Sequence, residues 1–248
     1  MNLVERLDKG TVLCAEGYLF EMEKRGYLQA GAFVPEVVLE HPEVVTQLHR
    51  EFIRAGSDVV QAFTYYGHRE KLRLIGKEDL LEPLQKNALQ IAKDVASEFP
   101  NLELMIAGDV ANTNIYDPND RNSLIEVEKM YEEQIVWAKE AGVDFIIAET
   151  IQWTGEALIA LKKIKEVGLT AVINLAIPAN DLTRDDDRPE DACKIFEDNG
   201  ADVVGLNCFR GPVHTMKHLI NIREKVSCHV AGLPVPVRTT DEFPVWFS

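Results

Sequence analysis

Short apolar and β-branched runs alternate with longer amphipathic stretches along the chain. Seven runs have the length and composition of buried strands: Thr11–Glu16, Asp58–Tyr65, Glu103–Val110, Asp144–Thr150, Thr170–Ala176, Asp202–Cys208 and His229–Leu233. Between the runs, apolar residues recur at helical spacing, as at Leu158, Leu161 and Ile164. This alternation predicts consecutive βα units on a parallel sheet.

The boundaries of the predicted helices carry recognisable signals. Pro42 suits a first helical turn, and Ser123-Leu124-Ile125-Glu126 is typical of a capping box that opens a helix ending at Gly142. Three predicted helices end in similar sequences, in which a glycine is followed two residues later by an aspartate. They are Ala55-Gly56-Ser57-Asp58-Val59, Ala141-Gly142-Val143-Asp144-Phe145 and Asn199-Gly200-Ala201-Asp202-Val203. Each glycine would adopt the left-handed conformation that ends a helix. The repeated joint favours one domain over residues 1–248.

Seven parallel strands with interleaved helices predict an α/β fold, a (β/α)8 TIM-type barrel that is incomplete because an eighth strand is missing. The chain of 248 residues is 46% hydrophobic, which is enough for the core of one such barrel. In barrels of this kind the reactive groups collect at the C-terminal ends of the strands. The sequence therefore directs attention to those ends.

Charge and cysteine content narrow the classes of partner. A formal net charge of −15 argues against nucleic acid or an anionic membrane surface, because binding phosphates relies on clustered Lys and Arg. No apolar run is long enough to span a bilayer. The four cysteines are too few and scattered for a disulfide framework, so we expect a cytoplasmic protein with reduced thiols and small-molecule substrates.

The predicted strand ends carry an unusual set of reactive side chains. They include Glu16 with Gly17, Tyr65 with Tyr66, Glu149 and Cys208. From spacing alone, a lone cysteine ending an apolar strand is more often a small buried hydrophobe than a ligand, and the two tyrosines could pack under a loop. A carboxylate directly after four apolar residues, as at Glu149, tends to be buried with a partner.

Six segments of the sequence form a recognisable series: Glu16-Gly17-Tyr18-Leu19-Phe20, Glu23-Lys24-Arg25-Gly26-Tyr27, His41-Pro42-Glu43, Leu48-His49-Arg50-Glu51-Phe52, Phe63-Thr64-Tyr65-Tyr66 and Gly205-Leu206-Asn207-Cys208. With these segments the chain resembles the homocysteine S-methyltransferase family, and particularly its betaine-using members. The resemblance covers essentially the whole chain in the correct order. The resemblance implies a zinc-dependent barrel that transfers a methyl group from betaine to homocysteine, giving dimethylglycine and methionine.

The same resemblance implies roles for individual residues. Cys208 would be a zinc ligand, while the family's other two zinc cysteines lie in a Gly-Gly-Cys-Cys-Gly segment that this sequence does not contain. Glu16, next to Gly17, and Glu149 would hold the homocysteine amino group. The methyl donor would contact Phe33, Tyr65 and Tyr66. Full-length members would form homo-oligomers.

These residue types suit the implied chemistry. Zinc with three protein ligands and an open fourth position deprotonates a substrate thiol, which otherwise is mostly protonated at neutral pH. A trimethylammonium group has no hydrogen-bond donor, so aromatic faces would bind it through cation–π attraction of about 1–2 kcal/mol per ring.

Three alternatives remain beside a betaine-dependent methyltransferase. One is a homocysteine methyltransferase with another donor, such as S-methylmethionine. Another is a non-catalytic fragment of such an enzyme. The third is a phosphate-handling lyase or isomerase, which is disfavoured because no Gly-rich phosphate loop follows the seventh run and no lysine ends an identified strand.

Overall fold

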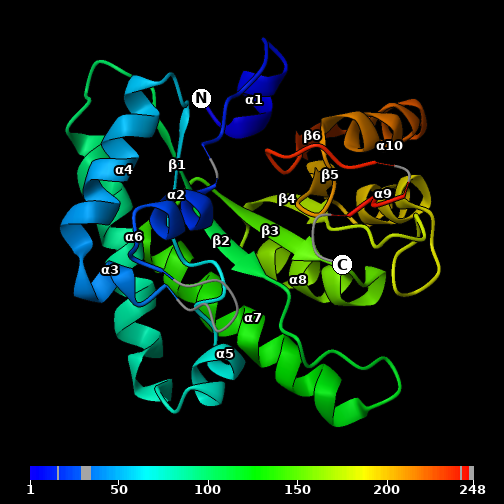
Figure 1. Ribbon diagram of the computed structural model, residues 1–248, viewed down its shortest axis with the longest axis horizontal. Helices are drawn as coiled ribbons and strands as arrows, with labels where there is room; N and C mark the ends of the chain where they lie inside the picture. Colours follow the sequence, from blue (N-terminus) through cyan, green and yellow to red (C-terminus); the bar gives the residue numbers. More distant parts are fainter. Residues whose placement is uncertain (16, 29–34, 241, 246–248) are drawn as a thin grey trace. The chain divides into compact units, whose positions relative to one another are not determined.

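The computed structural model describes residues 1–15, 17–28, 35–240 and 242–245 (Figure 1). Two predicted site residues, Glu16 and Phe33, lie outside these ranges. The chain divides into two compact units: unit 1 comprises residues 1–115 and 132–146, and unit 2 comprises residues 116–131 and 147–248. Each unit is a compact body of its own, and the single domain over 1–248 stays a prediction.

Unit 1 packs helices around a pair of parallel strands. Its strands β1 (Val59–Gln61) and β2 (Met105–Ala111) pair in parallel, with Val59 opposite Met105. Its helices are α1 (Leu3–Leu7), α2 (Tyr18–Lys24), α3 (Val37–Glu40), α4 (Pro42–Arg54), α5 (Arg69–Leu74) and α6 (Leu81–Ser97), with a 3-10 turn η1 (Glu78–Leu80). Helices α4 and α6 contact each other and the strands, so the predicted βα alternation is confirmed here.

The first predicted strand, Thr11–Glu16, is wrong over the residues that the structure describes. Only one parallel bridge forms, between Cys14 and Val59. Side chains take the place of a ladder: the Asp58 carboxylate accepts a hydrogen bond from the Leu13 N–H at 2.8 Å, and the Ser57 hydroxyl accepts one from the Ala15 N–H at 2.9 Å. The segment is therefore held at its backbone without becoming a regular strand.

Two elements contain residues of both units, α7 (Arg121–Ala141) and β3 (Phe145–Ile151). The predicted capping box at Ser123 is wrong, because α7 begins two residues earlier. The Ser123 hydroxyl instead accepts a hydrogen bond from the Asp117 N–H at 2.8 Å, and the Asp120 carboxylate accepts one from the Asn122 N–H at 2.9 Å. An aspartate outside the predicted box satisfies the first turn.

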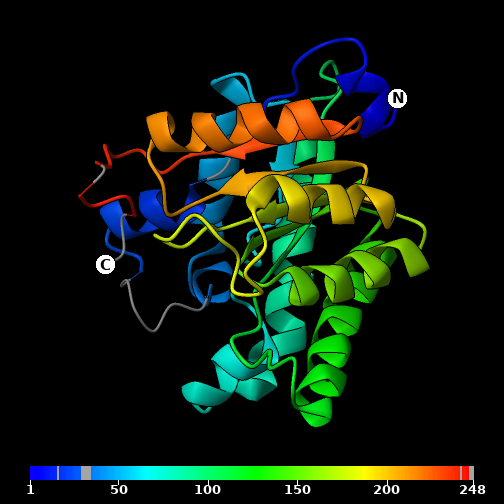
Figure 2. The ribbon, with the colours of Figure 1, turned by 90° about the vertical axis from the view of Figure 1, so that its right-hand side faces the viewer.

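Unit 2 contains the most regular βα repeats. After β3 it runs α8 (Thr154–Glu166), β4 (Thr170–Leu175), α9 (Pro189–Asp198), β5 (Val203–Asn207), α10 (Pro212–Lys225) and β6 (His229–Leu233). Strand β5 pairs in parallel with β4 on one side and with β6 on the other. Figure 2 shows α8, α9 and α10 following one another beside these strands. The predicted strands and helices of this half of the chain are confirmed.

The repeated αβ joint is confirmed at all three glycines. Gly56, Gly142 and Gly200 have φ angles of 105°, 81° and 94°. A residue with a Cβ is strained in this region, so glycine ends each helix at the least cost.

The aspartate of each joint also bonds the backbone of a neighbouring strand or segment. Its carboxylate accepts a hydrogen bond from a backbone N–H of the preceding βα unit, in a pattern that recurs three times. The pairs are Asp58 with Leu13 at 2.8 Å, Asp144 with Ile106 at 2.7 Å and Asp202 with Ala171 at 2.8 Å. The aspartate N–H also donates to the carbonyl of the same partner residue in each case. The repeat in the sequence is thus a structural joint.

Six strands occur in the described ranges, together with the Cys14–Val59 bridge. The first of the seven predicted strands is thus absent from the described residues, and the second, Asp58–Tyr65, is shortened to Val59–Gln61, so Tyr65 and Tyr66 lie after the strand and not at its end. Among the residues that the structure describes, no helix is long and apolar enough to cross a bilayer.

Candidate functional site

Asn207 is the centre of a buried polar group at the strand ends of unit 2. Its side-chain amide donates hydrogen bonds to Glu149 Oε2 at 2.6 Å and to Thr150 Oγ1 at 2.8 Å. Its carbonyl oxygen accepts one from the Thr150 N–H at 2.8 Å. Since β3 supplies Glu149 and Thr150 and β5 supplies Asn207, one amide joins the ends of two strands.

The thiol of Cys208 belongs to the same group. The Thr150 hydroxyl and the Asn207 amide lie 3.7 Å and 3.6 Å from its sulfur, each in position to donate a weak hydrogen bond. Hydrogen-bond donors favour a negatively charged acceptor. The structure thus brings together two of the predicted site residues, Glu149 and Cys208, through a shared amide.

Glu149, Thr150 and Asn207 are 6%, 3% and 1% exposed. A hydrogen bond to a charged group in such surroundings is worth about 1.5–3 kcal/mol, and leaving the group without a partner costs at least as much. Cys208 is half-buried. The acid is therefore held firmly, and Cys208 is the less buried residue of the group.

The backbone around this group is strained. Thr150, Cys208 and Phe209 have φ angles of 59°, 55° and 55°, in the left-handed region that residues with a Cβ seldom adopt. Such conformations persist where the surroundings enforce them, and they concentrate at functional sites. The strain thus falls on the residues that present the thiol.

The described residues do not by themselves form a metal site. Among them, no three His, Cys, Asp or Glu side chains lie close enough to hold a metal ion. Cys14 belongs to unit 1, Cys193 is buried in α9, and burial raises the pKa of Cys228 to about 11. Of the four cysteines, Cys208 is the one that lies in the strand-end group, and a zinc site needs three or four protein ligands.

Asn174, near the end of β4, is a further buried polar residue of unit 2. It is 3% exposed, and its Oδ1 has no hydrogen-bond partner among the described residues. In the register of β4 and β5 it lies opposite Gly205, two residues before Asn207 along β5. An unsatisfied buried oxygen at this level is suited to accept a hydrogen bond from a bound molecule.

In unit 1 the structure brings Tyr65 and Tyr66 together, with ring centroids 4.3 Å apart. The ammonium of Lys71 lies over the Tyr66 ring, 4.2 Å from its centroid. The chain's own cation therefore occupies a face that was predicted to bind a trimethylammonium group. Gly17, with φ of 86°, precedes the first residue of α2 and acts as its N-cap.

Three histidines contact polar side chains within the fold. His49 is buried, its Nδ1 lies 2.9 Å from the hydroxyl of Tyr18, and burial lowers its pKa to about 3. His214 and His218 lie on α10 and contact Thr239 and Asp181.

Sequence reasoning does not single out Asn207 or Thr150 as site residues. A signal for Asn207 was present: an amide that follows four buried residues of a strand must find buried partners. Thr150 carries no comparable local signal, since its role depends on a left-handed backbone and on a strand distant in sequence.

The βα repeats and the buried acid–amide–thiol group define an α/β protein with a polar site at its strand ends. The model of the family described as homocysteine S-methyltransferase matches residues 13–242. The chain therefore belongs to the homocysteine S-methyltransferase family, as the sequence resemblance predicted.

Individual relatives agree with this assignment. The chain is 35% identical to betaine–homocysteine S-methyltransferase 1 of Xenopus tropicalis over 97% of its own length and 60% of that relative. It is 31% identical to the S-methylmethionine–homocysteine S-methyltransferase of Pongo abelii over 97% of its length and 65% of that protein. The chain thus spans about three fifths of the length of the first of these relatives.

A solved structure defines the fold. The metallated form of the homocysteine methyltransferase MmuM from Escherichia coli superimposes with a TM-score of 0.74 at 15% identity, covering 94% of this chain and 95% of that one. The chain has an α/β fold of the (β/α)8 TIM type, and its described residues supply six strands of an incomplete barrel.

Proposed function

We propose that this chain carries the homocysteine-binding site of an S-methyltransferase that converts homocysteine to methionine. The observation that carries the proposal is Asn207, whose single amide touches both the carboxylate of Glu149 and the thiol of Cys208. Homocysteine has an ammonium group and a sulfur atom a few bonds apart. An acid and a soft sulfur ligand fixed side by side suit both ends of that molecule.

Glu149 would bind the ammonium group. A buried carboxylate gains most from a cationic partner, and Asn207 already orients one of its oxygens. Asn174 Oδ1 would accept a further ammonium hydrogen. These acceptors would select an amino acid over a simple thiol.

Cys208 would lie toward the homocysteine sulfur. We propose zinc as the metal to which it contributes one thiolate, in agreement with the family resemblance. When bound, zinc would hold the substrate sulfur as a thiolate and so make it nucleophilic at neutral pH. A cytoplasmic location and assembly into a homo-oligomer accompany this proposal as predictions.

Betaine is the proposed methyl donor, with S-methylmethionine as the alternative. Both donors carry a positively charged centre, so the aromatic faces of Tyr65 and Tyr66 suit either. The Lys71 ammonium lies over the face of the Tyr66 ring, so it would have to move aside before either donor could bind to that face. Donor identity is decided by measuring methionine formation with each donor in turn.

A second candidate function is homocysteine binding without methyl transfer. The single thiol in the described part of the site favours it, because one thiolate does not make a zinc site. Zinc content and methionine formation, measured on the same preparation, distinguish the two candidates: zinc with turnover supports the methyltransferase, and homocysteine binding without either supports the second candidate.

The central test is calorimetric titration of L-homocysteine into the parent chain and into Glu149→Gln. Loss of a charge-assisted hydrogen bond worth about 1.5–3 kcal/mol should weaken binding roughly tenfold or more. Glu224→Gln is the matched control, since this exposed glutamate lies on α10 away from the strand ends, and it should leave the dissociation constant unchanged. Equal affinities for the parent and Glu149→Gln would exclude the proposed role of the acid.

A further inference from the structure

Arg210 is a buried cation that directly follows the strained residues Cys208 and Phe209. Its side chain is 4% exposed, although arginine is among the residues least often buried. Burial lowers the pKa of its guanidinium, and the nearby Asp181 carboxylate opposes that effect. A charge placed at such cost must have enough partners to satisfy it.

The partners of Arg210 come from the segment that follows β4. The guanidinium Nε donates to the Ile177 carbonyl at 3.2 Å, and Nη2 donates to the Pro178 carbonyl. Nη2 also lies 2.7 Å from the Asp181 carboxylate, which contacts His218 on α10 as well. The planar guanidinium thus reaches three acceptors on one neighbouring segment, which no other side chain could do.

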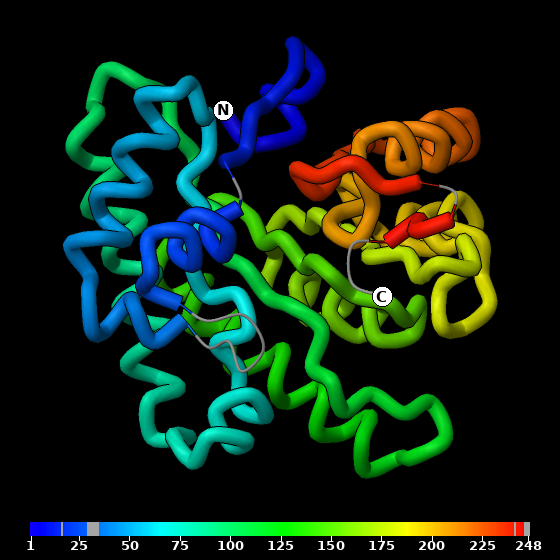
Figure 3. The backbone as a smooth tube through the Cα atoms, in the orientation of Figure 1, coloured from blue at the N-terminus to red at the C-terminus, as the bar shows by residue number. Residues whose placement is uncertain are grey.

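The backbone of the same loop is fixed from its other side. The Cys208 N–H donates to the Leu233 carbonyl at 3.0 Å, and the Val235 N–H donates to the Arg210 carbonyl at 3.0 Å. The tube in Figure 3 shows the chain after β6 (red) returning beside the loop that follows β5 (orange).

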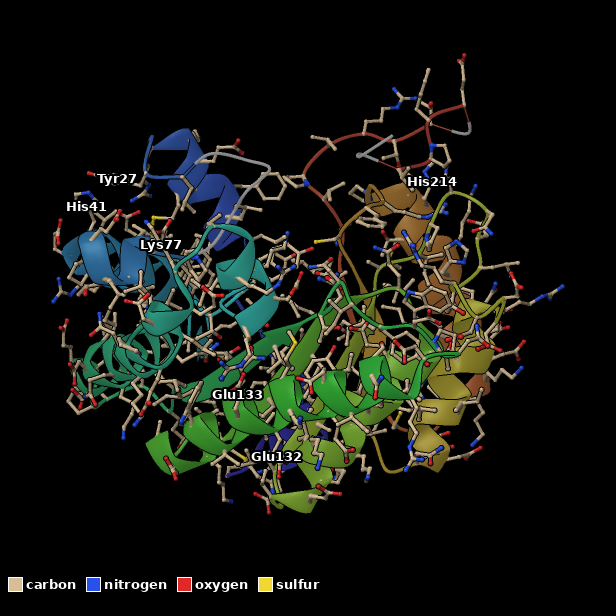
Figure 4. All side chains as sticks on the ribbon, turned by 90° about the horizontal axis from the view of Figure 1, so that it is seen from below. Tyr27, His41, Lys77, Glu132, Glu133 and His214 are labelled. Atoms are coloured by element: carbon tan, nitrogen blue, oxygen red, sulfur yellow. The ribbon has the colours of Figure 1, made fainter. Side chains whose placement is uncertain are left out.

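Thr239 completes this attachment. Its hydroxyl accepts a hydrogen bond from the Gly211 N–H at 3.0 Å and lies 2.9 Å from the Nδ1 of His214. Figure 4 labels His214 on α10. The loop that presents the thiol is therefore tied to the segment after β4 by one side chain, and to the segment after β6 by main-chain and hydroxyl bonds.

We propose that Arg210 is a positioning residue for Cys208: by holding the loop 208–210 to the segment after β4, it keeps the sulfur beside Thr150 and Asn207. The left-handed conformations at Cys208 and Phe209 are unfavourable by themselves, so contacts outside the dipeptide must maintain them. Arg210 is the next residue, and its side chain supplies three such contacts. The inference rests on the proposed role of Cys208 and deepens it.

The test measures how accessible the Cys208 sulfur is in the parent chain, Arg210→Lys and Asp181→Asn. Iodoacetamide alkylation at pH 9.5, read by peptide mass spectrometry, gives the rate at each cysteine, because an ordinary thiol with pKa near 8.5 is then largely ionised. Cys228, with its raised pKa, reacts more slowly, so each cysteine is compared only with itself in the parent chain. Lysine keeps the charge but cannot reach three acceptors, so Arg210→Lys should accelerate Cys208 alkylation about fivefold or more. Cys14 and Cys228, in the same digest, should change less than twofold.

Asp181→Asn keeps the proposal testable should the buried substitution prevent folding. It alters a residue whose side chain is 58% exposed and leaves both carbonyl bonds of Arg210 intact, so a rise of about twofold at Cys208 is expected. Arg184→Lys is the matched control: it lies in the same loop between β4 and α9, is exposed, and bonds Gln152 instead. It should leave all rates unchanged.

Two results would overturn the positioning role. One is an unchanged Cys208 rate in both variants. The other is an equal rise at Cys14, Cys208 and Cys228, which would mean that Arg210 stabilises the fold in general. The readout does not involve homocysteine, so a failed Glu149→Gln titration would remove the proposed function while leaving the alkylation result to decide how the loop is held.

Discussion

The helix-to-strand joints and the strand-end group both use acidic side chains as hydrogen-bond acceptors, but they differ in every other respect. At the joints, Asp58, Asp144 and Asp202 are at least partly exposed, bond backbone N–H groups, and follow glycines that adopt the left-handed conformation readily. At the strand ends, Glu149 is buried and bonds a side-chain amide, and residues with a Cβ carry the left-handed strain.

This difference distinguishes the joints, which have a structural role, from the strand-end group, which is the candidate site. The glycine–aspartate joint recurs three times in similar sequences, and each time it ends a helix and fixes the start of the next strand. This role is structural and common to successive βα units. The strand-end group combines a buried acid, a soft sulfur and strained backbone in one place. These features cost stability, and proteins retain such costs where a function requires them.

Glu197 has a structural role similar to that of the joint aspartates. Its carboxylate accepts hydrogen bonds from the Ser227 and Cys228 N–H groups at 2.6 Å and 2.7 Å, just before β6 begins. A glutamate on α9 thus does for β6 what the joint aspartates do for the earlier units. The glycine–aspartate sequence of the other joints does not occur before β6, so this contact could not be predicted from the sequence.

The largest expected effect is that of Asn207→Ala. The substitution removes the amide that joins the two strand ends, and with it the hydrogen bond to the Glu149 carboxylate and the acceptor of the Thr150 N–H. We expect the free energy of unfolding in urea to fall by about 2–4 kcal/mol, since each buried group without its partner costs about 1–3 kcal/mol.

Asn199→Ala serves as the control for this variant. That exposed amide bonds only the Ile195 carbonyl at the end of α9, so its loss should cost well under 1 kcal/mol. Equal losses for the two asparagines would mean that the strand-end group is no more tightly coupled than a surface turn.

A joint aspartate should have a smaller effect, confined to stability. Asp144→Ala removes the acceptor of the Ile106 N–H in unit 1, which should lower the free energy of unfolding by about 1 kcal/mol. Asp144→Asn keeps an acceptor oxygen and should recover most of that loss. Both variants should bind homocysteine with the parent's affinity; a tenfold change in affinity would contradict the separation between joint and site.

The smallest effect is expected in the acid range and concerns Glu197. The hydrogen bond from Lys194, with those from the two backbone N–H groups, lowers the pKa of Glu197 to about 2 from an ordinary value near 4.5. A depressed carboxyl pKa means that the stabilisation is fully present above pH 4.5 and is lost as the pH falls from 4.5 toward 2. Glu197→Gln should flatten the pH dependence of unfolding in that window and leave it unchanged above pH 5.

The sequence predicted the scaffold well because its determinants are local. Alternating runs and helical spacing identified the six strands of the described residues, and they were wrong at Thr11–Glu16, where Ser57 and Asp58 side chains replace a ladder. The predicted start of α7 was wrong because the segment that begins at Ser123 has the sequence of a capping box, whereas the Asp120 carboxylate accepts the hydrogen bond from the first turn of the helix.

The site was predicted only in part, and for a physical reason. Glu149 and Cys208 stand out as polar or reactive residues at the ends of apolar runs. Asn207 and Arg210 act through partners on other strands and segments, so their roles appear only once the strands are paired. Spacing alone could not reveal that Lys71 lies on the Tyr66 ring.

The proposed role of Glu149 is to bind the ammonium group of homocysteine beside Cys208. A crystal structure of this chain with bound L-homocysteine tests that role most directly. We expect the substrate nitrogen within hydrogen-bond distance of the Glu149 carboxylate, about 2.7–3.2 Å, and the substrate sulfur directed toward Cys208. Homocysteine bound with its nitrogen on another acid, or with Glu149 out of hydrogen-bond reach of the substrate, would contradict the role.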